Sequence, residues 1–126
     1  MSIGSELVQA VAAQDESALQ ACFATEVEFR GLTPFGLRER TGAVEAAALI
    51  SAWFADSTEL DLVNTHTEEV GDRLYISYRF HGVEEGEPYV VEQQLYGTVQ
   101  DGKIAHADLL CSGFRPRLAE QSRARP

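Results

Sequence analysis

The chain has 126 residues, which is enough for one domain with a buried core and too few for two. Its hydrophobic content of 44% and charged content of 24% are those of a globular protein, so the body is not expected to be disordered. A formal net charge of -10 argues against binding to nucleic acid or to an anionic membrane surface, because both demand a basic face.

Three helices are expected in the first half of the chain. Ser5 is a candidate N-cap for a helix that runs to about Ala13, and Asp15 is a candidate cap for a second, shorter helix. A third helix is predicted from Ala43 to about Ala55, because apolar side chains recur on one side of it. These side chains are Val44, Ala47, Ile50, Trp53 and Phe54.

Strands are predicted for most of the remainder. Residues 27–29 alternate in character, and residues 35–37 are expected to return as a short second strand. Four strands in hairpin succession follow, with the last turn at Asp101-Gly102, because both central positions of a two-residue type I′ turn need positive φ. Helices that are separate from a long antiparallel meander define an α+β domain.

The two cysteines, Cys22 and Cys111, lie far apart and outside any metal or redox motif, so both are interpreted as reduced and buried. No metal and no cofactor are expected. The first residues lack a cationic segment before an apolar one, and no run approaches the roughly 18 apolar residues that span a bilayer. We therefore expect a cytoplasmic protein that contacts no membrane.

The order of the elements, the length and three segments resemble the nuclear transport factor 2-like superfamily, which includes SnoaL-like polyketide cyclases and ketosteroid isomerases. The segments are residues 14–29, 70–74 (Val-Gly-Asp-Arg-Leu) and 101–104 (Asp-Gly-Lys-Ile). The resemblance implies a cystatin-like cone, in which a curved sheet wraps round a long helix and leaves a conical pocket. We expect this domain at residues 1–114 and a flexible basic tail at residues 115–126.

The strand register predicts which polar groups face the pocket. Counting outward from the turn at residues 85–86 places Tyr78 opposite Gln93 on a mostly apolar face that the helices must cover. Both are candidates for ligand binding, although a hydrogen bond between them within the core is an equally good interpretation. The candidate pocket lining is Tyr78, Gln93, Trp53, Leu95, Leu109 and Cys111.

The register of the last strand decides where Asp108 lies. Simple counting across the turn at residues 101–102 points Asp108 inward, where it would be the best general base in the chain. Proteins of the resembling superfamily carry a bulge after the position of Ile104, which would turn Leu109 and Cys111 inward and leave Asp108 outside. The bulged register is favoured, because it buries apolar or small side chains.

The catalytic candidates are Asp108 and His66, with a surface or interface role as the alternative for His66. Arg79 and Glu92 are expected to face each other across two strands, a pairing that ordinarily stabilises a sheet. The resemblance also argues against the mechanism of ketosteroid isomerases. The positions that match their acid–base and oxyanion groups are occupied here by apolar residues. These residues are Leu7, Leu95 and Phe29.

Two functions are compatible with the sequence. The first is a small-molecule-binding domain with an apolar conical pocket, which would act on a hydrophobic metabolite as an isomerase, cyclase or hydrolase if it is an enzyme. The second is a non-catalytic homodimeric interaction or accessory module with a filled pocket. Its dimer interface would be the outer sheet face, through Tyr75, Arg79, Gln94, Tyr96 and Leu110.

Overall fold

A computed structural model describes residues 2–117 of the chain. It contains three helices: α1 (Ile3–Ala12), α2 (Glu16–Ala21) and α3 (Ala43–Phe54). The first begins earlier than predicted, because Ser2 is its N-cap and accepts a hydrogen bond of 3.1 Å from the backbone N–H of Ser5. Asp15 caps α2 as predicted, through a 3.0 Å bond from the N–H of Ala18.

Seven strands form one curved sheet in the order β2-β1-β6-β5-β4-β3, with β7 added to β5. The strands are β1 (Phe23–Thr33), β2 (Gly36–Thr41), β3 (Ser57–Val70), β4 (Arg73–Glu84), β5 (Glu87–Gln100), β6 (Lys103–Cys111) and β7 (Arg115–Pro116). All neighbouring pairs are antiparallel except β1 and β6, which run parallel. The predicted α+β class is confirmed, with a mixed rather than purely antiparallel sheet.

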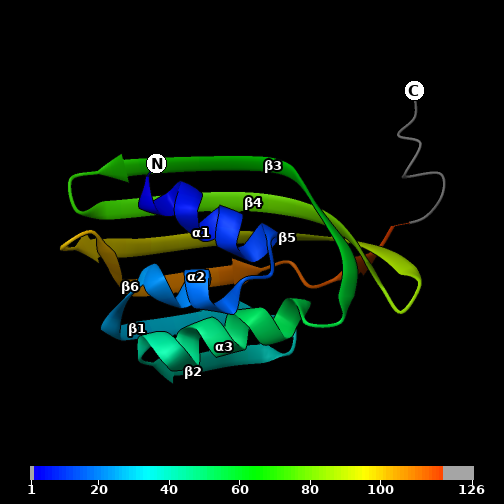
Figure 1. Ribbon diagram of the computed structural model, residues 1–126, viewed down its shortest axis with the longest axis horizontal. Coiled ribbons are helices and arrows are strands. Elements are labelled where there is room, and N and C mark those ends of the chain that lie inside the picture. The colour runs from blue at the N-terminus through cyan, green and yellow to red at the C-terminus, as the bar shows by residue number, and fades with distance from the viewer. Residues whose placement is uncertain (1, 118–126) are drawn as a thin grey trace.

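The helices all lie on one face of the sheet (Figure 1). The first helix, α1, packs against β3 and β4, whereas α3 packs against β1 and β2. The core fills the space between these layers. Burial on α3 differs from the prediction at one position: Val44 is 57% exposed, and Ala46 is buried instead. Among residues 2–117, no helix covers the outer face of the sheet.

The turns at residues 85–86 and 101–102 have the geometry that their sequences predict. Positive φ angles occur at Glu85 and Gly86 (52° and 81°) and at Asp101 and Gly102 (52° and 77°). The first turn sets the register in which Tyr78 pairs with Gln93, as counting predicts. Because side chains alternate along a strand, both residues then face the helices.

The bulge in the last hairpin is also confirmed. Val99 pairs with Ile104 and Thr98 pairs with His106, so Ala105 is the extra residue on β6. Beyond the bulge, Leu109 and Cys111 are buried. Asp108 lies on the outer face, since its neighbours on β6 take the inner positions.

The chain continues along the sheet after β6. Arg115 pairs with Val90 of β5, and the N–H of Arg117 donates a 3.0 Å hydrogen bond to the carbonyl oxygen of Pro88. The first residues of the segment predicted as a flexible tail therefore lie on the sheet. Residues 118–126 of that segment lie outside the described residues. Across residues 2–117, no helix has the length and apolar character needed to cross a membrane.

Candidate ligand-binding site

Tyr78 and Gln93 lie deep inside the cone, with 1% and 0% of their surface exposed. The hydroxyl of Tyr78 donates to Oε1 of Gln93 at 2.6 Å, and Nε2 of Gln93 donates to Sγ of Cys111 at 3.3 Å. Burial raises the pKa of Tyr78 well above its ordinary value, so the phenol stays neutral and remains a donor. The two polar groups satisfy each other, which is the alternative that the register left open.

The other predicted lining residues divide into two groups. Leu95 and Leu109 are buried in the same hydrophobic core as Tyr78, and Gln93 is fully buried as well. Trp53 and Cys111 border an open hollow of about 370 Å³, which we call the cone mouth, and Cys111 also belongs to the buried core. The remaining residues of the cone mouth are Thr33, Pro34, Phe35, Arg38, Glu84, Gly113 and Phe114.

Two close approaches of the chain shape the cone mouth. A Cβ atom at Gly31 would lie 3.0 Å from Cη2 of Trp53, so the indole rests over a position of β1 that has no side chain. Gly113 has a φ of 88°, and a Cβ atom there would lie 2.7 Å from Cγ of Pro34. The segment after β6 therefore passes directly beside the turn between β1 and β2.

Aromatic rings and a thiol form much of the wall. The ring of Phe114 packs against Phe54 and Tyr89, with centroids 5.4 and 5.0 Å away. Sγ of Cys111 accepts 3.3 Å hydrogen bonds from Nε2 of Gln93 and from the N–H of Gly113. Phe35 at the β1–β2 turn is 88% exposed. Such a wall suits the apolar body of a ligand.

The cone mouth also carries two opposite charges. Among the described residues that line it, Glu84 supplies the one carboxylate and Arg38 the one guanidinium. Glu84 ends β4 and Arg38 lies on β2, and both side chains are partly buried. A carboxylate at the edge of an apolar wall can accept a proton from a bound molecule.

Four lining residues of the cone mouth were not predicted from the sequence: Phe35, Arg38, Glu84 and Phe114. One signal for Phe35 was present, because an aromatic residue between Pro34 and Gly36 occupies a turn, where it cannot be part of the core. The positions of Glu84 and Phe114 depend on contacts between distant segments, which local pattern does not reveal.

The two catalytic candidates lie on the outer face, away from the cone mouth. Asp108 accepts a 2.9 Å hydrogen bond from Nε of Arg30 and lies 3.1 Å from Nε2 of His106. Burial by itself would raise the pKa of Asp108, but these hydrogen bonds outweigh it and hold the pKa below the usual value. His66 is exposed on β3, 3.4 Å from Glu68.

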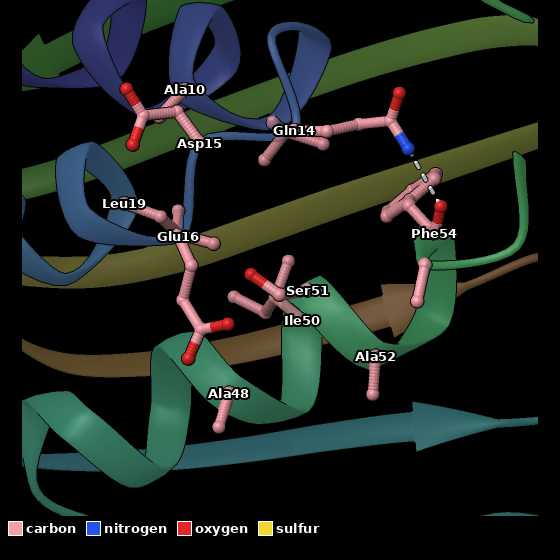
Figure 2. A pocket seen from close by; sticks show the side chains of 12 residues that line it. Ala10, Gln14, Asp15, Glu16, Leu19, Ala48, Ile50, Ser51, Ala52 and Phe54 are labelled. Atoms are coloured by element: carbon pink, nitrogen blue, oxygen red, sulfur yellow. Dashed lines mark hydrogen bonds between the residues drawn. The ribbon is translucent and has the colours of Figure 1, made fainter. Parts of the chain in front are cut away.

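A second hollow, of about 360 Å³, lies between the three helices (Figure 2). Glu16 extends from α2 towards α3 there, and Nε2 of Gln14 donates a 2.8 Å hydrogen bond to the carbonyl oxygen of Phe54. Asp15 is already used as the cap of α2. Because its polar groups hold the helices together and alanines form much of its wall, we favour the cone mouth as the ligand site.

Within residues 2–117, no group of three or more His, Cys, Asp or Glu side chains is arranged to hold a metal ion. The curved sheet with helices on one face and an opening at one end is the architecture of the nuclear transport factor 2-like superfamily. The SnoaL-like domain family matches residues 5–107, and the chain belongs to that family.

Solved structures share the fold at low sequence identity. A protein from Catenulispora acidiphila with a ketosteroid isomerase-like fold, crystallised with trimethylamine, has a TM-score of 0.73 at 18% identity, over 87% of this chain and 85% of that one. A candidate polyketide cyclase from Xanthomonas campestris has a TM-score of 0.70 at 22% identity, over 86% of each chain.

A candidate isomerase from Rhodopseudomonas palustris has a TM-score of 0.60 at 20% identity, over 85% of this chain and 84% of that one. No curated protein matches the sequence at a significant level. At these identities the likeness concerns the fold alone.

Proposed function

We propose that this protein binds a hydrophobic small molecule in the cone mouth. The observation that carries the proposal is an open hollow of about 370 Å³ whose wall contains Trp53, Phe114 and Cys111. Its size lies within the range of small-molecule pockets, and an apolar wall with a few polar groups is typical of them. The charged pair Glu84 and Arg38 would orient the polar end of the ligand.

The chemistry that fits this site is a cyclase or isomerase reaction on a hydrophobic metabolite. Structural neighbours named as candidate cyclases and isomerases support this class of reaction. In the cone mouth Glu84 would act as the base and Arg38 would stabilise developing negative charge. Mechanisms of the ketosteroid isomerase kind do not apply, because Leu7, Leu95 and Phe29 are apolar and buried.

The deep candidates Tyr78 and Gln93 would act on the ligand indirectly. Their hydrogen bonds end at Cys111, and Cys111 is one of the residues that line the cone mouth. We therefore assign them a positioning role, together with the apolar packing of Leu95 and Leu109. Trp53 and Cys111 would contact the ligand directly.

Binding can be tested with the fluorescence of Trp53, the one tryptophan in the chain. A panel of hydrophobic metabolites with a carboxylate or carbonyl group is titrated, and thermal unfolding is measured in parallel, because a ligand of the native state raises the apparent stability. A true ligand should change the Trp53 emission and raise Tm.

The variant Phe35→Ser should bind that ligand more weakly. It should lose no stability, since the ring of Phe35 is 88% exposed. Val70→Ser, at the exposed end of β3, is the matched control and should bind as the parent does. If no compound in the panel alters either signal, or if both variants weaken binding equally, the proposal fails.

A second function, homodimerisation through the outer sheet face, is supported by an exposed apolar row. Leu32 pairs with Leu37 on one side and with Leu110 on the other, and each is about half exposed. Tyr96 is 57% exposed, and its ring centroid lies 4.8 Å from that of Tyr75. Apolar and aromatic side chains gathered on a bare sheet face favour association with a second copy.

A further inference from the structure

The outer face of the sheet carries another open hollow, of about 430 Å³, which we call the arginine hollow. It lies where β7 runs along β5, which separates β7 from β4 (Figure 1). Its lining residues are Arg79, His81, Val90, Glu92, Ser112, Arg115, Pro116 and Arg117. Of these residues, Arg79 alone also belongs to the dimer interface predicted from the sequence.

Hydrogen bonds fasten the C-terminal wall of the arginine hollow to β5. The N–H of Ser112 donates to the carbonyl oxygen of Glu92, and the N–H of Glu92 donates to Oγ of Ser112, both at 2.9 Å. Further along, Arg115 pairs with Val90 in β7. These backbone contacts hold the C-terminal segment along β5, on the opposite side of that strand from Arg79 of β4.

The charge of the arginine hollow is opposite to that of the protein. The chain has 10 Lys and Arg residues against 20 Asp and Glu. Three of the arginines line this hollow, whereas Glu92, 3.1 Å from Arg79, is the one carboxylate among the described residues that line it. Asp61 lies beyond the rim, opposite His81 on β3.

The pKa of His81, which lines the arginine hollow, is lower than that of an ordinary histidine. Burial is the largest cause that lowers the pKa of His81, followed by the positive charges of Arg117 and Arg79, while Asp61 acts in the opposite direction. The ring is therefore neutral near pH 7, although it lies in a strongly acidic protein. The positive charges of Arg117 and Arg79 thus add to the effect of burial on the pKa of His81.

We propose that the arginine hollow binds the anionic oxygen group of a small molecule, either a phosphate or a carboxylate. Guanidinium groups bind such oxygens through paired, charge-assisted hydrogen bonds, and several of them converge here from two segments. The site is separate from the cone mouth, because Cys111 faces inward and Ser112 outward on the segment that both hollows share.

The test is a titration of the 15N-labelled protein with inorganic phosphate, and in a second arm with acetate, at constant ionic strength. Binding should shift the amide resonances of Arg79, His81, Ser112 and Arg115, and bound phosphate should raise the pKa of His81. A response to phosphate alone assigns the ligand group as phosphate, and a response to both admits carboxylates.

Arg115→Gln should weaken phosphate binding about tenfold, as expected for the loss of a charge-assisted bidentate contact. Arg73→Gln removes the same charge from the far end of β4 and should leave the affinity unchanged. Three results would overturn the proposal: no saturable response to either anion, resonance shifts elsewhere on the surface, or equal weakening by both variants. Each is independent of whether the cone mouth binds a ligand.

Discussion

The hydroxyl of Tyr78 and the amide oxygen of Gln93 form a 2.6 Å hydrogen bond inside the cone, where neither side chain reaches water. A buried polar group contributes little net stability when it is paired, but it costs much more when its partner is removed. The stability of the cone interior therefore depends on both residues being present together.

We predict that Tyr78→Phe and Gln93→Leu each lower the free energy of unfolding by about 1 to 3 kcal/mol, because each leaves one buried polar group without its partner. The double variant should lose clearly less than the sum of the two, since it leaves neither group of the pair behind. Urea unfolding of all four proteins measures this coupling. Additive losses would show that the hydrogen bond contributes nothing of its own.

A second prediction concerns the bulge of β6. A Cβ atom at Gly97 would overlap the backbone carbonyl oxygen of His106, which the bulge brings towards β5. Backbone cannot move aside as a flexible side chain can, so Gly97→Ala should destabilise the protein by about 3 kcal/mol. Thr98→Ala is the control, because it changes the next residue of the same strand without the overlap, and it should lose less stability. The free energies of unfolding are measured by chemical denaturation. A larger loss for Thr98→Ala than for Gly97→Ala would contradict the bulged register.

Local sequence signals predicted the hairpins, whereas the remaining strand pairing depends on contacts between distant segments. Asp101-Gly102 carries its turn type in its own two residues, and counting from such a turn fixed the pairing of Tyr78 with Gln93. The parallel pairing of β1 with β6 has no local signature, because the two strands are separated by most of the chain. Local patterns therefore predict the strands but not the mixed sheet.

The candidate site shows the same division. Trp53 and Cys111 were selected because they lie on elements with clear periodicity, and both border the cone mouth. Arg38 and Glu84 were not selected, because each lies at the end of its own hairpin and only the curvature of the sheet brings the two to one opening. Tyr78 and Gln93 were placed on the inner face, but periodicity cannot tell a ligand contact from a satisfied core pair.

A third prediction follows from Asp108, whose folded-state pKa is depressed by Arg30 and His106. An ordinary aspartate titrates at about pH 4, so the interaction stabilises the protein fully above that pH and is lost as the pH falls through the lower folded pKa. Asp108→Asn should therefore lower Tm at pH 7 but not below the folded pKa. Asp72→Asn, on an exposed turn, is the control; a Tm loss for Asp108→Asn that is the same at every pH would contradict the prediction.

A fourth prediction concerns the support of the cone mouth by Gly31. Gly31→Ala would press on Cη2 of Trp53 at 3.0 Å, which should shift the tryptophan emission and cost about 1 kcal/mol of stability. Combining it with Trp53→Phe, which removes the atom in contact, should cost less than the two single variants together. If the emission of Gly31→Ala equals that of the parent, the indole does not rest on β1 in solution.

The last prediction tests the outer sheet face. A lysine in place of Tyr96, or a glutamate in place of Leu110, would place a charge in the apolar centre of the proposed dimer interface, where burying it without a partner is costly. Both variants should sediment as monomers at concentrations at which the parent sediments as a dimer. Val70→Lys adds a charge at the exposed end of β3 and should leave the dimer intact. A parent protein that stays monomeric at every concentration would exclude this interface.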